Sequence, residues 1–210
     1  MIYSARRVFA LFVFAVAASV VTVGQQRNLC ADEQPYDFTT RLSGGYRIVF
    51  TTDNELKYLS LWKGKRKITE ISSVSCGLLH KNLGYIGADF PKHFAFVNSF
   101  GSGNLHFVSL IRKADGIDIL SKEKDVCWVG ADEKNSLMIY STACVPKATS
   151  RMVLFNMKTL HKRSVRFPSI VFTGPEALNR ISIVSVSRNF VVLEFEDWGR
   201  TRSTRLRYRF

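Results

Sequence analysis

Gly84-Tyr85-Ile86-Gly87-Ala88-Asp89 has a second, similar copy in Val126-Cys127-Trp128-Val129-Gly130-Ala131-Asp132. In both copies an aromatic residue and a β-branched residue precede Gly-Ala-Asp. Each copy begins a series of short apolar runs separated by polar turns. A period of about 40–50 residues that holds four short strands is typical of a propeller blade. The repeat therefore predicts an all-β chain built from similar antiparallel units.

The pattern extends outward from the two copies and gives four units. Their third strands align at 56–62, 105–111 and 152–158, and a last unit covers 181–210. Helix signals are nearly absent, since no long stretch keeps a 3.6-residue apolar period. We therefore expect a single β-propeller-like domain of about four small blades over residues 25–210, with a two-sheet β-sandwich as the alternative. Residues 37–42 would then close the ring from the N-terminal end.

Two local patterns refine this expectation. Several predicted strands are apolar on both faces, for example at 152–155 and 190–193, as expected of sheets stacked between other sheets. Asp115-Gly116 predicts a hairpin turn into an outer strand at 117–120. The chain resembles WD-type repeat proteins only in this general blade pattern, because their Gly-His and Trp-Asp dipeptides are missing.

The first 24 residues are predicted to be a secretion signal peptide. Arg6 and Arg7 precede an apolar run over 8–23, and small residues at Thr22 and Gly24 suit a cleavage site. A retained signal anchor is the alternative. The sequence has no Asn-x-Ser/Thr sequon, which favours a bacterial periplasm over a eukaryotic secretory route. We expect a periplasmic or secreted protein, without stable membrane insertion.

Four cysteines in an exported chain predict two disulfide bonds. Cys127 opens one predicted strand and Cys144 ends the next, so a hairpin would bring the two together. Cys30 is then left to pair with Cys76. Neither CxxC pairs nor Cys/His clusters are present, so no metal site is predicted.

The chain is strongly basic. Loss of the signal peptide would lower its net charge from +13 to +11. The arginines near the C-terminus alternate with other residues and form a cationic stripe of Arg200, Arg202, Arg205, Arg207 and Arg209. Such a stripe either binds an acidic partner or protects an edge strand from pairing with another chain.

The last residues also resemble the terminal signature of bacterial outer-membrane β-barrel proteins, with a final Phe210 preceded by Tyr208 and Leu206 at every second position. That resemblance implies a membrane barrel. The rest of the chain departs from it, because most predicted strands are shorter than the 9–11 residues that cross a bilayer.

No catalytic constellation is predicted. Ser102 lies between two glycines in a hairpin context, not in the Gly-x-Ser-x-Gly turn of a hydrolase. The four histidines are scattered, and Asp89 and Asp132 recur where an aspartate would cap a turn. We therefore expect no cofactor and no enzymatic activity.

The predicted function is binding to a protein partner, which the basic stripe suggests is acidic. The most specific version is a periplasmic inhibitor or immunity-type protein that neutralises a toxin. No nucleic-acid partner is expected. Two alternatives stay open: a propeller-type hydrolase or lyase in which Asp89, Asp132 and histidines converge on a central channel, and a small outer-membrane barrel.

Overall fold

A computed structural model of the protein describes residues 30, 39–99, 105–147, 149–168, 176–196 and 202–210. In these ranges the chain is all-β, and its strands form three antiparallel sheets. Three short 3₁₀ segments connect some of the strands: η1 (Ser43–Gly45), η2 (His80–Leu83) and η4 (Ala177–Arg180). The predicted signal peptide, residues 1–24, lies outside the described residues.

Each sheet follows the order of its strands in the chain. The first sheet holds β1 (Thr39–Leu42), β2 (Tyr46–Thr52), β3 (Leu56–Lys63) and β4 (Arg66–Ser75). The second holds β5 (Tyr85–Asp89), β6 (His93–Ser99), β7 (His106–Arg112), β8 (Cys127–Asp132), β9 (Leu137–Ser141), β10 (Arg151–Asn156) and β11 (His161–Arg166). The third holds β12 (Ile181–Val186), β13 (Phe190–Glu196) and β14 (Ser203–Arg209).

The second sheet consists of two units that meet at one point. Between β7 and β8 the only paired residues are Phe107 and Cys127, next to a backbone hydrogen bond from Val108 N to Val126 O. The described strands therefore form four antiparallel units, which are β1–β4, β5–β7, β8–β11 and β12–β14. We call them the first to fourth units. Both copies of the repeated phrase form the first strand of a unit, as the sequence predicts.

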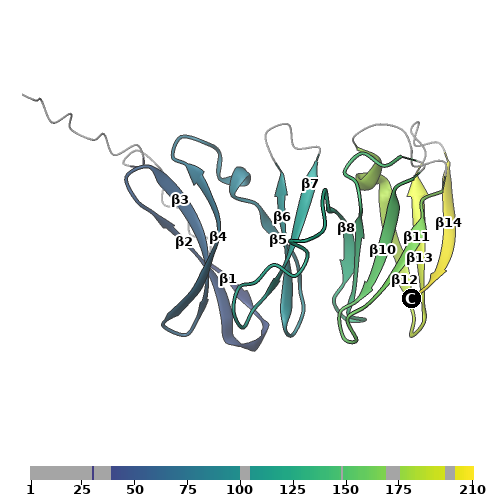
Figure 1. Ribbon diagram of the computed structural model, residues 1–210, viewed down its shortest axis with the longest axis horizontal. Helices are drawn as coiled ribbons and strands as arrows, with labels where there is room; N and C mark the ends of the chain where they lie inside the picture. The colour runs from purple at the N-terminus through teal and green to yellow at the C-terminus, as the bar shows by residue number, and fades with distance from the viewer. Residues whose placement is uncertain (1–29, 31–38, 100–104, 148, 169–175, 197–201) are drawn as a thin grey trace, which may run out of the picture.

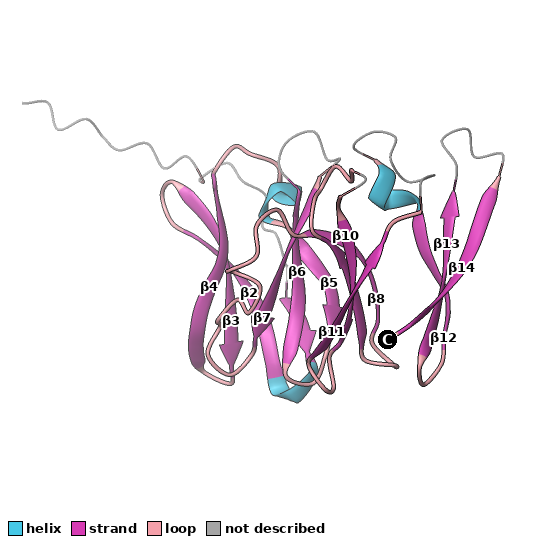
Figure 2. Ribbon diagram, turned by 45° about the vertical axis from the view of Figure 1, so that its right-hand side comes forward, coloured by secondary structure: helices cyan, strands magenta, loops and turns pink. Residues whose placement is uncertain are grey.

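The four units stand face to face in a row, with the first at one end and the fourth at the other (Figures 1 and 2). A separate apolar core fills each of the three spaces between neighbours. In β6, Phe94 and Phe96 enter the core toward the first unit, and Ala95 and Val97 enter the core toward the third. This arrangement explains why strands of the middle units are apolar on both faces.

The described strands do not close into a propeller ring. β1 pairs with β2 and buries Leu42 in the core between the first and second units, so this strand completes the first unit. The described strands of the fourth unit pair only with one another. The all-β, antiparallel part of the prediction is thus confirmed. The ring is not confirmed. The face-to-face packing of separate sheets resembles that of the alternative, a two-sheet sandwich, but here four units are stacked.

The outer strand predicted at 117–120 is reduced to one bridge, between Asp118 and Ile111. The Asp118 side chain is the reason. Its Oδ1 accepts hydrogen bonds from the backbone N–H groups of Leu110, at 3.0 Å, and Leu120, at 2.9 Å. A side-chain oxygen therefore replaces part of the backbone ladder at this position.

Two disulfide bonds are present, and they join the predicted pairs. Cys127 and Cys144 have a Cα–Cα distance of 5.1 Å, and Cys30 and Cys76 one of 5.2 Å. The first bond ties the two ends of the β8–β9 hairpin region together. The second ties residue 30 to the end of β4. Disulfides of this kind are typical of a protein that folds in an oxidising compartment.

Candidate partner-binding face on the fourth unit

The last strand places its arginines on one face of the fourth unit. β14 pairs with β13 so that Arg205, Arg207 and Arg209 lie opposite Glu194, Val192 and Phe190. The alternate residues, Leu206, Tyr208 and Phe210, pack against the core between the third and fourth units. The period-two pattern in the sequence therefore separates a buried apolar face from an outer basic one.

The outer face is apolar at its centre. Phe190 and Val192 lie on it, because Val191, Leu193 and Phe195 are the β13 residues that enter the core. Val184, at a bulge in β12, is 42% exposed. We call this surface the arginine face; it consists of Val184, Phe190, Val192, Glu194, Arg205, Arg207 and Arg209.

The three arginines of this face differ in their contacts. Arg205 Nε lies 2.9 Å from Glu194 Oε1, and this hydrogen bond, followed by that from Ser203, holds the pKa of Glu194 below its usual value. The Arg207 guanidinium lies 3.8 Å from the ring centroid of Phe190, a cation–π contact. Arg209 forms no ion pair with a described carboxylate. Two of the three charges are therefore open to an anionic partner.

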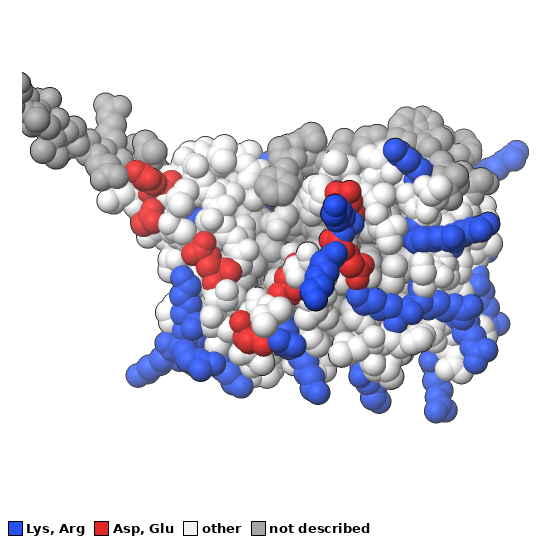
Figure 3. Space-filling view, viewed as in Figure 1, with Lys and Arg blue, Asp and Glu red and all other residues white. Residues whose placement is uncertain are grey.

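The rest of the predicted stripe is only partly visible. Arg202 is described and exposed, just before β14, whereas Arg200 lies outside the described residues. In the view of Figure 3, basic side chains gather along one long edge and at the end formed by the fourth unit, while acidic ones gather nearer the first unit and the middle. Positive charge is thus concentrated near the fourth unit on the side of the molecule seen in Figure 3.

The aspartates of the repeat have structural partners instead of a shared pocket. Asp89 Oδ2 accepts a hydrogen bond of 2.6 Å from Ser43 N, and its Oδ1 lies 2.5 Å from Lys113 Nζ. Lys113 is only 1% exposed and also donates to the Ser43 hydroxyl. These contacts join the first unit to the second. The sequence patterns did not single out Ser43 or Lys113.

Asp132 caps the β8–β9 turn, because its Oδ1 accepts a 2.9 Å hydrogen bond from Asn135 N. Within the described ranges, no three His, Cys, Asp or Glu side chains come close enough to hold a metal ion. Ser102 lies outside those ranges. Asp89 N also donates a 2.7 Å hydrogen bond to Glu133 Oε1, a residue of the same β8–β9 turn. The predicted alternative of a channel site at Asp89, Asp132 and histidines stays a prediction.

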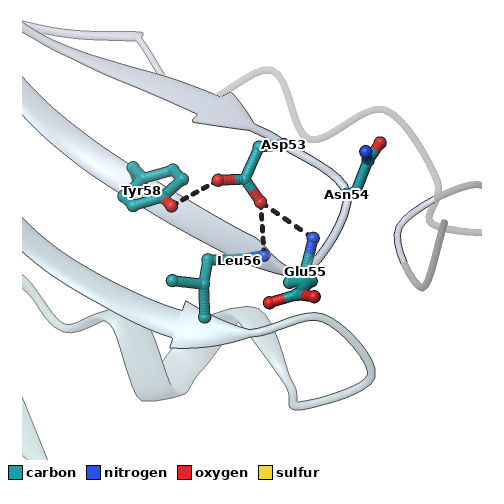
Figure 4. A pocket seen from close by; sticks show the side chains of 5 residues that line it. All are labelled: Asp53, Asn54, Glu55, Leu56 and Tyr58. Atoms are coloured by element: carbon teal, nitrogen blue, oxygen red, sulfur yellow. Dashed lines mark hydrogen bonds between the residues drawn. The ribbon is translucent and has the colours of Figure 1, made fainter. Parts of the chain in front are cut away.

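A shallow hollow at the β2–β3 turn is lined by Asp53 and Glu55, and the Asp53 carboxylate serves the turn itself (Figure 4). Asp53 Oδ1 accepts hydrogen bonds of 2.8 Å from the backbone N–H groups of Glu55 and Leu56. Its other oxygen accepts from the Tyr58 hydroxyl, which lowers the pKa of Asp53 and raises that of Tyr58 to about 12. This hollow is a capped turn.

No protein-family model matches this chain, and no curated protein proved similar to it. Among the described residues, none of the helical segments has the length and apolar content of a membrane-spanning helix.

Proposed function

We propose that this protein is an exported, non-catalytic binding domain whose arginine face contacts an acidic protein partner. The observation that carries the proposal is that β13 has apolar residues on a face that no core covers among the described residues. The first half of this strand is apolar on both faces, like the strands of the middle units, yet among the described residues its sheet is packed against a core on one face only. Phe190, Val192 and the half-exposed Val184 stay on the other face.

The residues around this apolar centre favour an acidic partner. Arg207 and Arg209 are free of carboxylates from the described residues, so a partner's Asp or Glu side chains would meet them without displacing an existing ion pair. Interfaces of this kind combine an apolar centre with a charged rim, and arginine is enriched in them. The rim charges would mainly accelerate association.

The more specific version of the proposal is a periplasmic inhibitor or immunity-type protein that neutralises a toxin. The disulfides and the small size support it. Its non-catalytic character is supported by the use of Asp89 and Asp132 in structural contacts, and by the capped turn at Asp53. Identification of the partner would test this version directly, because an immunity-type protein must bind a toxin.

The test is a kinetic binding measurement with immobilised synthetic peptides. One peptide alternates Glu with Leu, and its control carries Gln in place of every Glu. We expect the protein to bind the Glu peptide and to lose affinity as salt rises, because steering charges are screened over about 8–10 Å at physiological ionic strength. The double variant R207Q/R209Q should associate about tenfold more slowly.

A second double variant controls for net charge. Lys122 and Lys124 are exposed and lie in the loop before β8, so K122Q/K124Q removes the same charge from another surface. It should associate at nearly the wild-type rate. Equal binding of the Glu and Gln peptides, or an equal effect of the two double variants, would contradict the proposal.

A further inference from the structure

A pocket of about 470 Å³ opens where turns of the second and third units meet. We call it the turn pocket. The β5–β6 turn and the start of β6 line it with Pro91, Lys92 and His93, and the β10–β11 turn lines it with Met157, Lys158 and Leu160. The β8–β9 turn contributes Ser136. Its volume lies in the range of about 300–1,000 Å³ that is typical of small-molecule sites.

The pocket has one apolar and one basic component. Pro91, Met157 and Leu160 provide apolar surface, and Leu160 is 52% exposed. Lys92 and Lys158 are exposed lysines from two different units, and neither is paired with a carboxylate of the described residues. An apolar body that carries one negative charge is the ligand that such a lining complements.

Leu160 has a backbone conformation that a leucine rarely adopts. Its φ is +59°, in the left-handed region that favours glycine, and its N–H donates a 2.8 Å hydrogen bond to Asn156 O. The turn is fixed further by Asn156 Oδ1, which accepts hydrogen bonds from the N–H groups of Lys158 and Thr159. A strained, exposed leucine at a pocket rim is an outlier that points to a binding role.

Acidic groups of the neighbouring turns are engaged elsewhere. In the β8–β9 turn, Glu133 Oε1 accepts a hydrogen bond from Asp89 N, and Asp132 Oδ1 accepts one from Asn135 N. Asp115 is held by two nitrogens of the Arg112 side chain, and Asp89 by Lys113. His93, 6% exposed, has a pKa lowered first by burial and then by Arg112 and the neighbouring lysines. Positive charge therefore prevails at the turn pocket, and a ligand carboxylate would reduce the repulsion among these groups.

We propose that the turn pocket binds a monocarboxylate attached to an apolar group, with the carboxylate at Lys92 and Lys158 and the apolar group against Leu160, Met157 and Pro91. Such a group is found in free acyl or aryl acids and at the C-terminal residue of a protein chain. The proposal does not depend on the arginine face, because the two surfaces share no residue.

The first experiment compares two ligands by calorimetry. The probe is N-acetyl-phenylalanine, and the control is N-acetyl-phenylalaninamide, which has the same apolar group without the charge. We expect the acid to bind and the amide to bind at least tenfold more weakly. In the acid titration, K92Q/K158Q should lose at least tenfold in affinity, and K122Q/K124Q should match the wild type. Equal binding of acid and amide, or full affinity in K92Q/K158Q, would overturn the proposal.

The variant L160G separates binding from folding. Glycine relieves the left-handed strain, so the melting temperature should rise, while affinity for N-acetyl-phenylalanine should fall several-fold because the apolar wall is lost. A weakened affinity in a stabilised protein cannot result from misfolding. Unchanged affinity in L160G would remove Leu160 from the site and overturn the assignment of the apolar group.

Two further probes distinguish the sources of the ligand. Decanoate represents a free acyl acid, and a hexapeptide that ends in Phe with a free carboxylate represents a protein C-terminus. Tighter binding of decanoate assigns a small acid, and tighter binding of the peptide assigns a protein chain end. Failure of decanoate, the peptide and N-acetyl-phenylalanine to bind would overturn the proposal, and would leave the arginine face untouched.

Discussion

A Cβ atom added to Gly87 would lie 3.0 Å from Cζ2 of Trp128, so the first strand of the second unit has no room for a side chain where the third unit meets it. Gly130 holds the matching place in the third unit, and there the nearest atom is Cδ1 of Ile183, at 3.5 Å. β8 contacts β5 on one side and β12 on the other. The repeated glycine therefore marks the position where the next unit packs, which gives the sequence repeat a physical reason.

These distances predict different costs for the same substitution. G87A should destabilise the protein by about 2 kcal/mol, because its methyl group would also lie 2.8 Å from Cγ2 of Val97 in a packed core. G130A should cost less than about 1 kcal/mol, since its methyl group makes ordinary contacts. Urea denaturation of both variants measures the difference. Equal costs would mean that the spacing of the units does not depend on Gly87.

The buried ion pair between Asp89 and Lys113 leads to a second prediction. D89N would leave a lysine that is 1% exposed without its counter-charge, so we expect a loss of roughly 3 kcal/mol in urea denaturation. The control is E70Q, which breaks the exposed Lys67–Glu70 pair with a separation of 3.9 Å and should cost less than about 1 kcal/mol. A D89N variant as stable as E70Q would show that Lys113 does not need its partner.

The strands could be predicted from the sequence because their signals are local. Short apolar runs and turn residues locate β5, β8 and β14, and the period-two alternation of β14 gives the correct face for Arg205 and Arg207. The exception at 117–120 arises because the side chain of Asp118 bonds to the backbone of Leu110. That contact competes with the strand ladder, and composition alone does not reveal it.

The arrangement of the units depends on contacts between distant residues. Ser43 and Lys113 meet at Asp89, and Lys92 and Lys158 line one pocket, although separate turns provide them. No spacing rule connects such residues. For the same reason the sequence could not decide between a closed ring and an open row of sheets, which differ only in how the end units are paired.

Each disulfide should contribute to the free energy of unfolding according to the length of chain that it encloses. In the chain-entropy model the Cys127–Cys144 bond, with a sequence separation of 17, is worth about 3 kcal/mol. The Cys30–Cys76 bond, with a separation of 46, is worth about 4 kcal/mol. Denaturation of C127A/C144A and of C30A/C76A tests this order. Non-reducing peptide mapping that recovered Cys76 linked to Cys127 would contradict both pairings.

The buried side chain of His93 should make the free energy of unfolding depend on pH. Burial, together with Arg112, Lys92 and Lys113, lowers its pKa in the folded protein, while Asp115 opposes this shift. The folded state therefore favours the neutral ring. The contribution of His93 to the free energy of unfolding is fully present above its unfolded pKa of about 6.5, and it is lost as pH falls below that value. H93Q should reduce the loss of stability between about pH 7.5 and pH 5, measured by urea denaturation.

A control for this prediction is H161Q, because His161 lies on the exposed strand β11. We expect H161Q to keep the wild-type pH profile. A profile that is the same in H93Q and in the wild type would mean that other groups cause the acid sensitivity.

The last prediction concerns β14 as an edge strand. It pairs with β13 on one side and has no described neighbour on the other, so its free backbone groups could pair with another chain. Alternating arginines at 205, 207 and 209 would oppose that pairing by charge repulsion between two copies. The triple variant R205Q/R207Q/R209Q should therefore self-associate at lower concentration than the wild type in sedimentation velocity, and high salt should promote association of the wild type. K122Q/K124Q/K134Q, which removes the same charge from exposed lysines elsewhere, should stay at the wild-type oligomeric state. If both triple variants self-associate equally, net charge is the cause, and the arginines have no particular role in protecting the edge.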